Sequence, residues 1–350
     1  MKTDLNSLLR ENIRKIIPYS TARDEYTNSG AGIFLDANEN PFNNGLNRYP
    51  DPKHKELRQK ISALKEIPME NIFTGSGSDE IIDLLIRAFC EPGHDKIMIN
   101  PPTYGMYEVS AQINGNEVVR VNLLENFEPD VEAILDKADK NPKILFLCSP
   151  NNPTGNVFRP DLVERLLNGL NAIVLIDEAY IDFSTQKSWI YRLEEFPNLV
   201  VMQTFSKARG MAGIRLGMAF GSSEIVNVLN KIKLPYNINN LSLEAALQNL
   251  ENQARYEREL QLIIKERERL LMELQTFDMI EKVFPSESNF VLCRVENANE
   301  IYTYLASQGI IVRNRSGQVL CNNCIRITVG TPEENTSLLE NLRKFEKLTQ

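Results

Sequence analysis

Residues 143–180, KILFLCSPNNPTGNVFRPDLVERLLNGLNAIVLIDEAY, decide the fold of this chain. The apolar run KILFLC at 143–148 leads into a turn-forming stretch, an amphipathic stretch follows, and AIVLI at 172–176 is a second apolar run. Strands that are almost apolar throughout are typical of sheets buried on both faces. Apolar runs that alternate with amphipathic stretches predict βα units and a mainly parallel sheet.

The same alternation continues on both sides of this stretch. It predicts five further strands, at residues 71–74, 96–100, 117–121, 199–203 and 216–220. The predicted fold class is therefore α/β, with a large domain whose mainly parallel seven-stranded sheet is sandwiched by helices, together with a smaller α+β domain.

The last third of the chain predicts the smaller domain. Residues 241–274 are long, charged and helical in pattern, so we expect one or two helices that bridge to it. Beyond them we expect strands at 289–295, 310–313 and 324–329, with helices at 298–308 and from Pro332. The predicted boundaries are 1–40 for an N-terminal arm contributing to the smaller domain, 41–240 for the large domain, and 241–350 for the linking helix and smaller domain.

The composition disfavours several classes of function. A net charge of −8 and a pI near 5.2 disfavour nucleic acid as a partner, because binding it needs a dominant basic surface. Nowhere do about 18 apolar residues run together, and the first residues lack the apolar stretch of a signal peptide. We therefore expect a protein without membrane association, located in the cytoplasm.

Cysteine and histidine limit the chemistry further. The five cysteines are an odd number, which predicts free thiols in a reducing compartment. His54 and His94 are the only histidines and each stands within two residues of a lysine, so we expect no metal site and no Ser/His/Asp triad. Cys321 and Cys324 form a lone C-x-x-C, which we interpret as a turn rather than as a zinc or redox site.

Polar residues follow three of the predicted strands, at the carboxyl ends where ligands bind in an open parallel sheet. These are Asn152 in SPNNPTG, Asp177 and Tyr180 in DEAY, and Ser206 with Lys207 in the third loop. Each alone also fits an ordinary strand end, and Asn-Pro-x-Gly is a good turn. Together they predict a site for a charged aromatic ligand, with Lys207 as the candidate nucleophile.

A glycine-rich turn predicts a seat for phosphate. Residues 75–80, GSGSDE, stand between a predicted strand and the helical pattern IIDLLIRAF, so free N–H groups and the helix dipole face the strand end. A well-capped helix without a ligand is the alternative interpretation. Arg215 follows Lys207 by eight residues, and nearby glycines predict turns that return its guanidinium toward the lysine, where it suits phosphate oxygens.

In order and spacing, these residues resemble the fold-type I pyridoxal-phosphate aminotransferases, and within them the histidinol-phosphate aminotransferases. The resemblance spans nearly the whole chain. It rests on the motifs DANENP (36–41), RYP (48–50), GSDE (77–80), PPTYGMY (101–107), SPNNPTG (149–155), DEAY (177–180), SK (206–207) with Arg215, and RITVGT (326–331). The segment ARGM at 208–211 departs from the pattern, and Arg209 has no place in it.

The resemblance implies pyridoxal 5′-phosphate as the cofactor. Lys207 would bind it covalently and then move the substrate proton, and Asp177 would keep the pyridine nitrogen protonated. Asn152 and Tyr180 would hydrogen-bond the ring oxygen, and Tyr104 would stack on the ring.

The resemblance also implies where the cofactor's phosphate lies. Backbone N–H groups of Ser78 and Asp79 would hold it, together with Ser206, Arg215 and the partner subunit's Tyr49. This arrangement implies a homodimer.

Substrate binding, by the same resemblance, falls to Arg326 and Arg313, with Tyr19 and Asn38 near the entrance. Two arginines suit a phosphate dianion that alternates with the carboxylates of glutamate. Because Arg326 stands in the strand pattern CIRITV, a solvent-facing position is the alternative interpretation.

The implied reaction converts L-histidinol phosphate and 2-oxoglutarate into 3-(imidazol-4-yl)-2-oxopropyl phosphate and L-glutamate, a step of L-histidine biosynthesis. Aromatic or broad-range aminotransferases, and decarboxylases for phosphorylated amino acids, would keep the same cofactor residues and stay open as alternatives. A non-enzymatic cofactor-binding regulator would need a DNA-binding module, which the acidic charge disfavours. A nicotinamide-dependent oxidoreductase would need a glycine fingerprint, and none of the predicted strands is followed by one.

Overall fold

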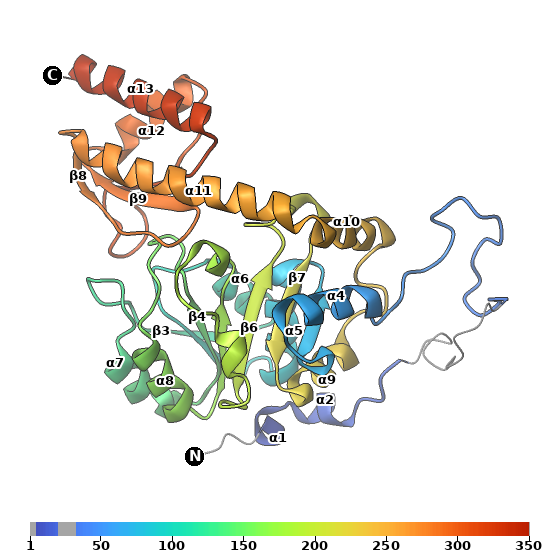
Figure 1. Cartoon of the computed structure of the whole chain (residues 1–350). Helices are drawn as coiled ribbons and strands as arrows, with labels where there is room; N and C mark the ends of the chain where they lie inside the picture. Colours follow the sequence, from blue (N-terminus) through green and yellow to red (C-terminus); the bar gives the residue numbers. More distant parts are fainter. Residues whose placement is uncertain (1–4, 20–32, 350) are drawn as a thin grey trace.

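The chain folds into a large and a smaller unit joined by a long helix. The computed structural model describes residues 5–19 and 33–349. Within these residues, seven strands form one sheet and four form a second. Figure 1 shows α11 (Gln253–Glu273) running from the large unit to the smaller one.

The large sheet is mainly parallel, which confirms the predicted fold class. Its strand order is β1-β7-β6-β5-β4-β2-β3, and among the described strands only β7 runs against its neighbours. The seven predicted strands agree with the structure to within one residue at each end. The observed bounds are Ile72–Gly75 (β1), Lys96–Ile99 (β2), Glu117–Arg120 (β3), Pro142–Cys148 (β4), Ile173–Asp177 (β5), Leu199–Thr204 (β6) and Gly217–Gly221 (β7).

Helices cover both faces of this sheet. One face packs against α5 (Gly77–Phe89), α6 (Met106–Ile113) and α9 (Ser223–Ile232), and the other against α4 (Lys55–Lys65), α7 (Val131–Asp136), α8 (Pro160–Gly169) and α10 (Asn240–Glu251).

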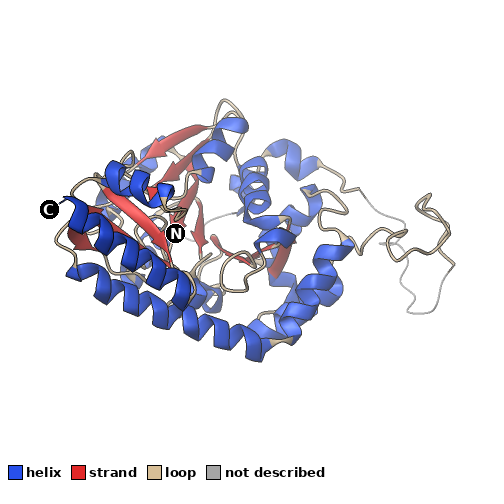
Figure 2. Cartoon of the chain, turned by 90° about the horizontal axis from the view of Figure 1, so that it is seen from above, coloured by secondary structure: helices blue, strands red, loops and turns tan. Residues whose placement is uncertain are grey.

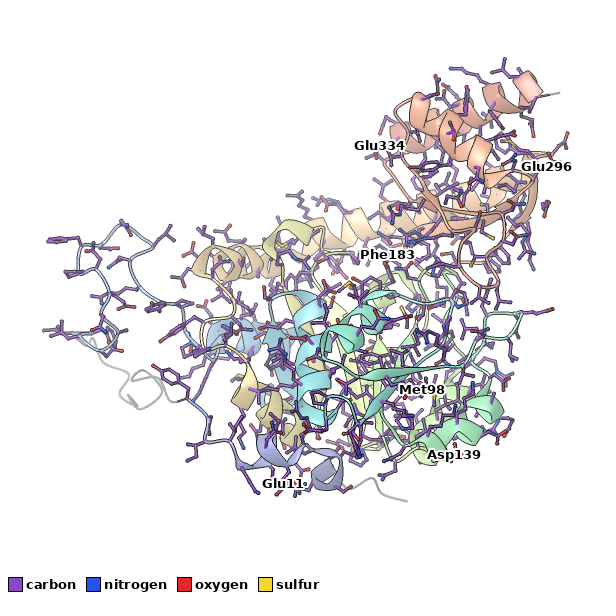
Figure 3. The ribbon with its side chains drawn as sticks, turned by 180° about the vertical axis from the view of Figure 1, so that it is seen from behind. Glu11, Met98, Asp139, Phe183, Glu296 and Glu334 are labelled. Atoms are coloured by element: carbon purple, nitrogen blue, oxygen red, sulfur yellow. The ribbon has the colours of Figure 1, made fainter. Side chains whose placement is uncertain are left out.

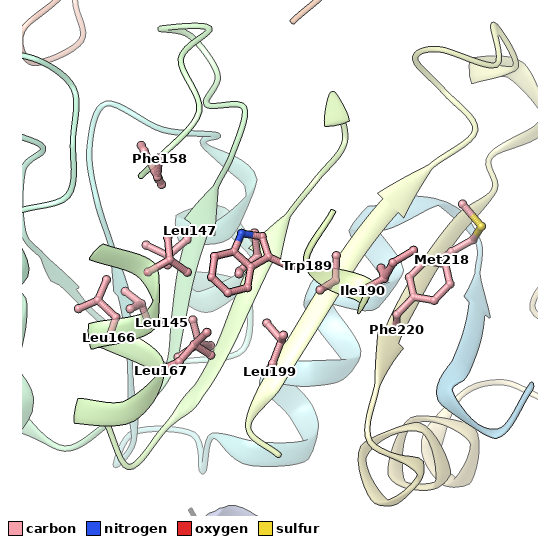
Figure 4. Packing of buried hydrophobic residues seen from close by; sticks show 14 of the residues in the cluster. Leu145, Leu147, Phe158, Leu166, Leu167, Trp189, Ile190, Leu199, Met218 and Phe220 are labelled. Atoms are coloured by element: carbon pink, nitrogen blue, oxygen red, sulfur yellow. The ribbon is translucent and has the colours of Figure 1, made fainter. Parts of the chain in front are cut away.

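Successive residues of β4 point to opposite faces, as the period of a strand requires. Leu145 and Leu147 pack with Leu166 and Leu167 of α8 (Figure 4), while Phe146 belongs to the core on the other face. Both faces of β4 are therefore buried, which is the physical reason for its unbroken apolar run.

The smaller domain is α+β, as predicted. Its antiparallel sheet has the order β10-β11-β9-β8. Its elements are β8 (Ile280–Val283), β9 (Phe290–Val295), α12 (Ala298–Ser307), β10 (Arg313–Asn314), β11 (Cys324–Thr328) and α13 (Pro332–Thr349). The sequence interpretation missed β8 because IEKV is a short edge strand with two charged residues and no fully buried one.

The N-terminal helices α1 (Leu5–Leu8) and α2 (Glu11–Lys15) lie on the large domain. Leu5 and Leu8 enter the core beside α5, and the Arg10 guanidinium donates to the Glu91 carboxylate at 2.9 Å. In Figure 3, the labelled Glu11 lies at the opposite end of the molecule from the smaller domain. Residues 5–15 thus pack on the large domain, and the contribution of the 1–40 arm to the smaller domain stays a prediction. The boundaries at 40 and 240 stay predictions.

Residues 33–50, which precede α4, contribute no side chain to the apolar cores. Ile33, Leu35 and Phe42 are each more than 80% exposed. Figure 2 shows this segment projecting away from the large domain.

Two further observations concern the described ranges. All five cysteines are free and buried, and these ranges contain no group of three or more His, Cys, Asp or Glu side chains that could hold a metal ion. No helix in them combines the length and apolar character needed to cross a bilayer.

Leu166 tests the packing of α8 on the sheet. Its side chain is fully buried, so Leu166→Ala should leave a cavity and lower the free energy of unfolding by about 2–5 kcal/mol. Leu262→Ala is the matched control, because Leu262 on α11 is 45% exposed, and its effect should stay below about 1 kcal/mol. Denaturant unfolding of both variants measures the difference. Equal free energies of unfolding for Leu166→Ala and Leu262→Ala would contradict this packing.

Candidate active site

A cavity of about 600 Å³ lies between the smaller domain and the carboxyl edge of the large sheet. Eleven of the predicted site residues line it. The part of the large domain that ends with β5 contributes Ser78, Asp79, Tyr104, Asn152 and Asp177. The later loops contribute Tyr180, Ser206, Lys207 and Arg215, and the smaller domain contributes Arg313 and Arg326.

Strand pairing explains why residues far apart in sequence meet here. β4, β5 and β6 are adjacent and parallel, with Cys148 paired to Asp177 and Asp177 to Met202. Because parallel strands end at the same edge, the loops that carry Asn152, Tyr180 and Lys207 start side by side.

Asp177 is the last residue of β5, and its side chain is buried. The Tyr107 hydroxyl donates to one carboxylate oxygen at 2.5 Å, and the Ala179 N–H donates to the other at 3.0 Å. Burial raises the pKa of Asp177 to about 6, although these hydrogen bonds and Lys207 act to lower it. The carboxylate is held in one position, which suits it to pair with a protonated ring nitrogen.

Lys207 stands in the turn after β6, and its Nζ lies 5.4 Å from the centroid of the Tyr180 ring. Burial is the main cause that lowers the pKa of Lys207, and Arg326 lowers it further, while Asp177 opposes the change. A lower pKa increases the share of neutral amine, which is the nucleophilic form.

The loop after β4 is fixed by Asn151 and presents Asn152 to the cavity. The Asn151 amide nitrogen donates to the Pro102 carbonyl at 2.9 Å and to the Thr154 hydroxyl at 2.7 Å. The Asn152 Oδ1 accepts a hydrogen bond from Arg326 Nη1 at 2.5 Å, so this bond joins the two domains across the cavity.

Glycines shape the predicted phosphate seat at the first turn of α5. A Cβ at Gly217 would lie 2.5 Å from Ser78 N, so only glycine lets β7 pass so close to the helix. Gly77 has φ +78°, and a Cβ there would lie 2.8 Å from Arg215 Nη2. Arg215 is therefore held against the helix N-terminus, where it also lies 3.4 Å from the Asp79 carboxylate. Free N–H groups, the helix dipole and a guanidinium together favour a phosphate.

The N-terminus of α5 is not capped by a serine side chain. Ser76 is the N-cap residue, but its side chain makes no capping hydrogen bond. The Glu80 carboxylate instead accepts from the Ser76 N–H, so an acid from within the helix holds the turn.

Three predicted site residues lie outside this cavity. Tyr19 lines a separate hollow with Pro52, and Asn38 and Tyr49 line another, in which Tyr49 stacks on Tyr236 with ring centroids 4.4 Å apart. Tyr19, Asn38 and Tyr49 are all exposed, and none of the three belongs to an apolar core. The expected position of Tyr19 and Asn38 near the entrance is not found within a single chain.

The structure shows what Arg209 contacts. Its guanidinium lies 4.2 Å from the centroid of the Tyr256 ring and donates to Asn249 Oδ1 at 3.2 Å. It therefore connects the Lys207 loop to α10 and α11 and does not line the cavity.

The sequence interpretation gave no role to Tyr107, Arg315 and Gln318. Tyr107 holds Asp177, and Arg315 and Gln318 line the cavity beside Arg313. Tyr107 was present in the motif PPTYGMY, and Arg315 alternates with Arg313, which is the spacing that puts two strand side chains on one face.

The comparisons with known proteins agree with this site. The family model described as aminotransferase class I and II matches residues 35–342, and the chain belongs to this family. It is therefore an aminotransferase by class. A protein from Cytophaga hutchinsonii, named histidinol-phosphate aminotransferase, is 51% identical over 349 residues, or 99% of this chain and 100% of that protein. A Flavobacterium johnsoniae protein of the same name is 49% identical over 342 residues, covering 97% of this chain and 98% of that protein.

A solved structure of a protein with the same name has a similar fold. The histidinol-phosphate aminotransferase from Clostridium acetobutylicum superposes with a TM-score of 0.80 at 30% identity, over 87% of this chain and 92% of that chain. The sheet and the domain arrangement are therefore those of this family of aminotransferases.

Asp177→Asn should stabilise the ligand-free protein at neutral pH. Because folding raises the pKa of Asp177 from 3.8 to about 6, the ionised carboxylate disfavours the folded state. This cost is absent below pH 3.8, grows as the pH rises, and is complete above pH 6, where it reaches at most about 3 kcal/mol.

The measurement is the Tm of wild type and variant between pH 4.5 and 7.5. The advantage of the variant should increase with pH, and Asp161→Asn, at an exposed carboxylate, should show no comparable gain. A wild type as stable as Asp177→Asn at pH 7.5 would contradict the assigned burial.

Proposed function

We propose that this chain is a pyridoxal 5′-phosphate-dependent histidinol-phosphate aminotransferase. It would transfer the amino group of L-histidinol phosphate to 2-oxoglutarate and so form L-glutamate and the corresponding 2-oxopropyl phosphate. The observation that supports this most is the single cavity in which a buried carboxylate, a lysine and a phosphate seat face arginines of the smaller domain.

The residues of the cavity fit this cofactor. Asp177 would pair with the pyridine nitrogen, and Tyr180 and the Asn152 amide nitrogen would meet the ring oxygen, since the Asn152 Oδ1 already accepts from Arg326. Tyr104 would lie against the ring.

The glycine-lined first turn of α5 fits the phosphate group. The N–H groups of Ser78 and Asp79 would hold it, with Ser206 and Arg215 beside them. When bound, the cofactor accepts the electron pair released at the amino-bearing carbon of the substrate.

Lys207 would both attach the cofactor and move the proton. Once the substrate amine has displaced it from the cofactor, Lys207 would be a neutral amine, as its lowered pKa favours, and would take the proton from the substrate Cα. Asp177 would keep the ring nitrogen protonated, and Tyr107 and the Ala179 N–H hold its carboxylate in place. The smaller domain would exclude water from this step.

Arg313 and Arg326 would bind the anionic group of each substrate. The phosphate of histidinol phosphate and the carboxylates of glutamate or 2-oxoglutarate would use the same arginines in turn, because guanidinium groups match both.

The proposal includes a homodimer, in which the partner subunit's Tyr49 would reach the cofactor's phosphate. The exposed apolar side chains of Ile33, Leu35 and Phe42 support it, because a second copy would remove them from water. Tyr19 and Asn38 are exposed as well, and their role in substrate binding is part of this proposal. The five free, buried cysteines fit a reducing compartment, so we place the protein in the cytoplasm.

A donor assay tests the function. Purified protein supplied with pyridoxal 5′-phosphate should release glutamate from 2-oxoglutarate and L-histidinol phosphate. We expect kcat/KM for L-histidinol phosphate to be at least about tenfold higher than for L-phenylalanine, because phenylalanine has no phosphate for the arginines to bind. Unphosphorylated L-histidinol is the matched control donor.

A preference for phenylalanine would instead favour an aromatic or broad-range aminotransferase. Release of CO₂ from O-phosphothreonine without formation of glutamate would favour a decarboxylase.

A further inference from the structure

Three arginines share one face of the ribbon formed by β10 and β11. Arg313 is paired directly with Arg326 in the antiparallel register. The Arg315 N–H donates to the Cys324 carbonyl at 2.7 Å, which continues the same pairing by one more step. Because side chains alternate along a strand, Arg315 is on the same face as Arg313, and all three arginines line the cavity.

Among the described residues that line the cavity, no acid is paired with these arginines. The two acids that line the cavity are Asp79, which lies beside Arg215, and Asp177, which accepts from Tyr107. Like charges opposite one another destabilise a pair of strands. Burial, with Arg315 and Arg313 nearby, lowers the pKa of Arg326 to about 10. A bound anion with more than one negative charge would offset this repulsion.

Arg315 has a donor that the protein does not use. In the described part of the chain, Arg315 Nε is buried without a hydrogen-bond partner, and so are Gln318 Oε1 and Arg326 Nε. Backbone bonds fix the loop, since the Gln318 N–H donates to the Arg315 carbonyl at 2.9 Å and the Cys321 N–H donates to the Gln318 carbonyl at 3.1 Å. Buried polar groups normally have partners, and the Arg315 side chain lines the cavity from a loop that backbone bonds hold in place, so this guanidinium is preorganised for an anionic ligand.

We propose that Arg315 is a specificity-determining residue that contacts the phosphate monoester of the amino donor. This rests on the proposed function of the cavity and deepens it. A phosphate monoester presents three terminal oxygens and a carboxylate only two. Three guanidinium groups can each bind one phosphate oxygen, while a single carboxylate leaves one guanidinium unmatched. Arg315 therefore favours histidinol phosphate over glutamate.

The test compares donors in the holoenzyme. In Arg315→Gln, KM for L-histidinol phosphate should rise about 10- to 100-fold, the range for a lost charge-assisted hydrogen bond. The kcat/KM for glutamate should change less than about threefold. Arg315→Lys keeps the charge and should recover part of the loss. An unchanged KM for histidinol phosphate, or an equal loss with both donors, would overturn the proposal.

Arg343→Gln is the matched control, because Arg343 on α13 pairs with Glu273 outside the cavity. Arg343→Gln should leave KM and kcat/KM unchanged with both donors. Thermal unfolding of all three variants checks that they fold. If the wild type does not use histidinol phosphate, the proposed function fails by itself. In that case the role of Arg315 is tested by inhibiting the glutamate reaction with inorganic phosphate. The inhibition constant of phosphate should be about tenfold higher in Arg315→Gln than in the wild type. An unchanged constant would overturn the role of Arg315.

Discussion

The parallel pairing of β4, β5 and β6 is the constraint on which the site depends. It sets Cys148 beside Asp177 and Asp177 beside Met202, so three polar loops begin at one edge of the sheet. The apolar cores on both faces hold the strands in this register, because a shift by one residue would turn Leu145 and Phe146 to the wrong faces. The chemistry at the edge thus depends on packing well away from it.

The two domains contribute different electrostatics to the cavity. The large domain buries Asp177 beside Lys207 and raises the pKa of the acid while lowering that of the amine. The smaller domain brings arginines, and the bond between Arg326 and Asn152 connects the two sides. Both arrangements cost folding stability without a ligand, which is common where groups are placed for function.

The sequence predicted most of what depends on local pattern. Apolar runs located every strand of the large sheet, and strand ends located Asp177 and Lys207. β8 was missed because a short charged edge strand has no apolar pattern. The packing of Leu5 and Leu8 was missed because a two-leucine helix does not indicate which core receives it. The contact between Tyr107 and Asp177 was missed because it joins segments 70 residues apart, which no local pattern shows. Tyr19, Asn38 and Tyr49 lie outside the cavity of this chain.

Chemical mapping of the bond between Lys207 and the cofactor distinguishes this proposal from attachment at any other lysine. The protein would be supplied with pyridoxal 5′-phosphate, reduced with borohydride to fix any bond between cofactor and lysine, digested, and analysed by mass spectrometry. The structure predicts the added mass on Lys207 and none on that peptide in Lys207→Ala. An added mass on another lysine of the wild type, or none at all, would contradict the account.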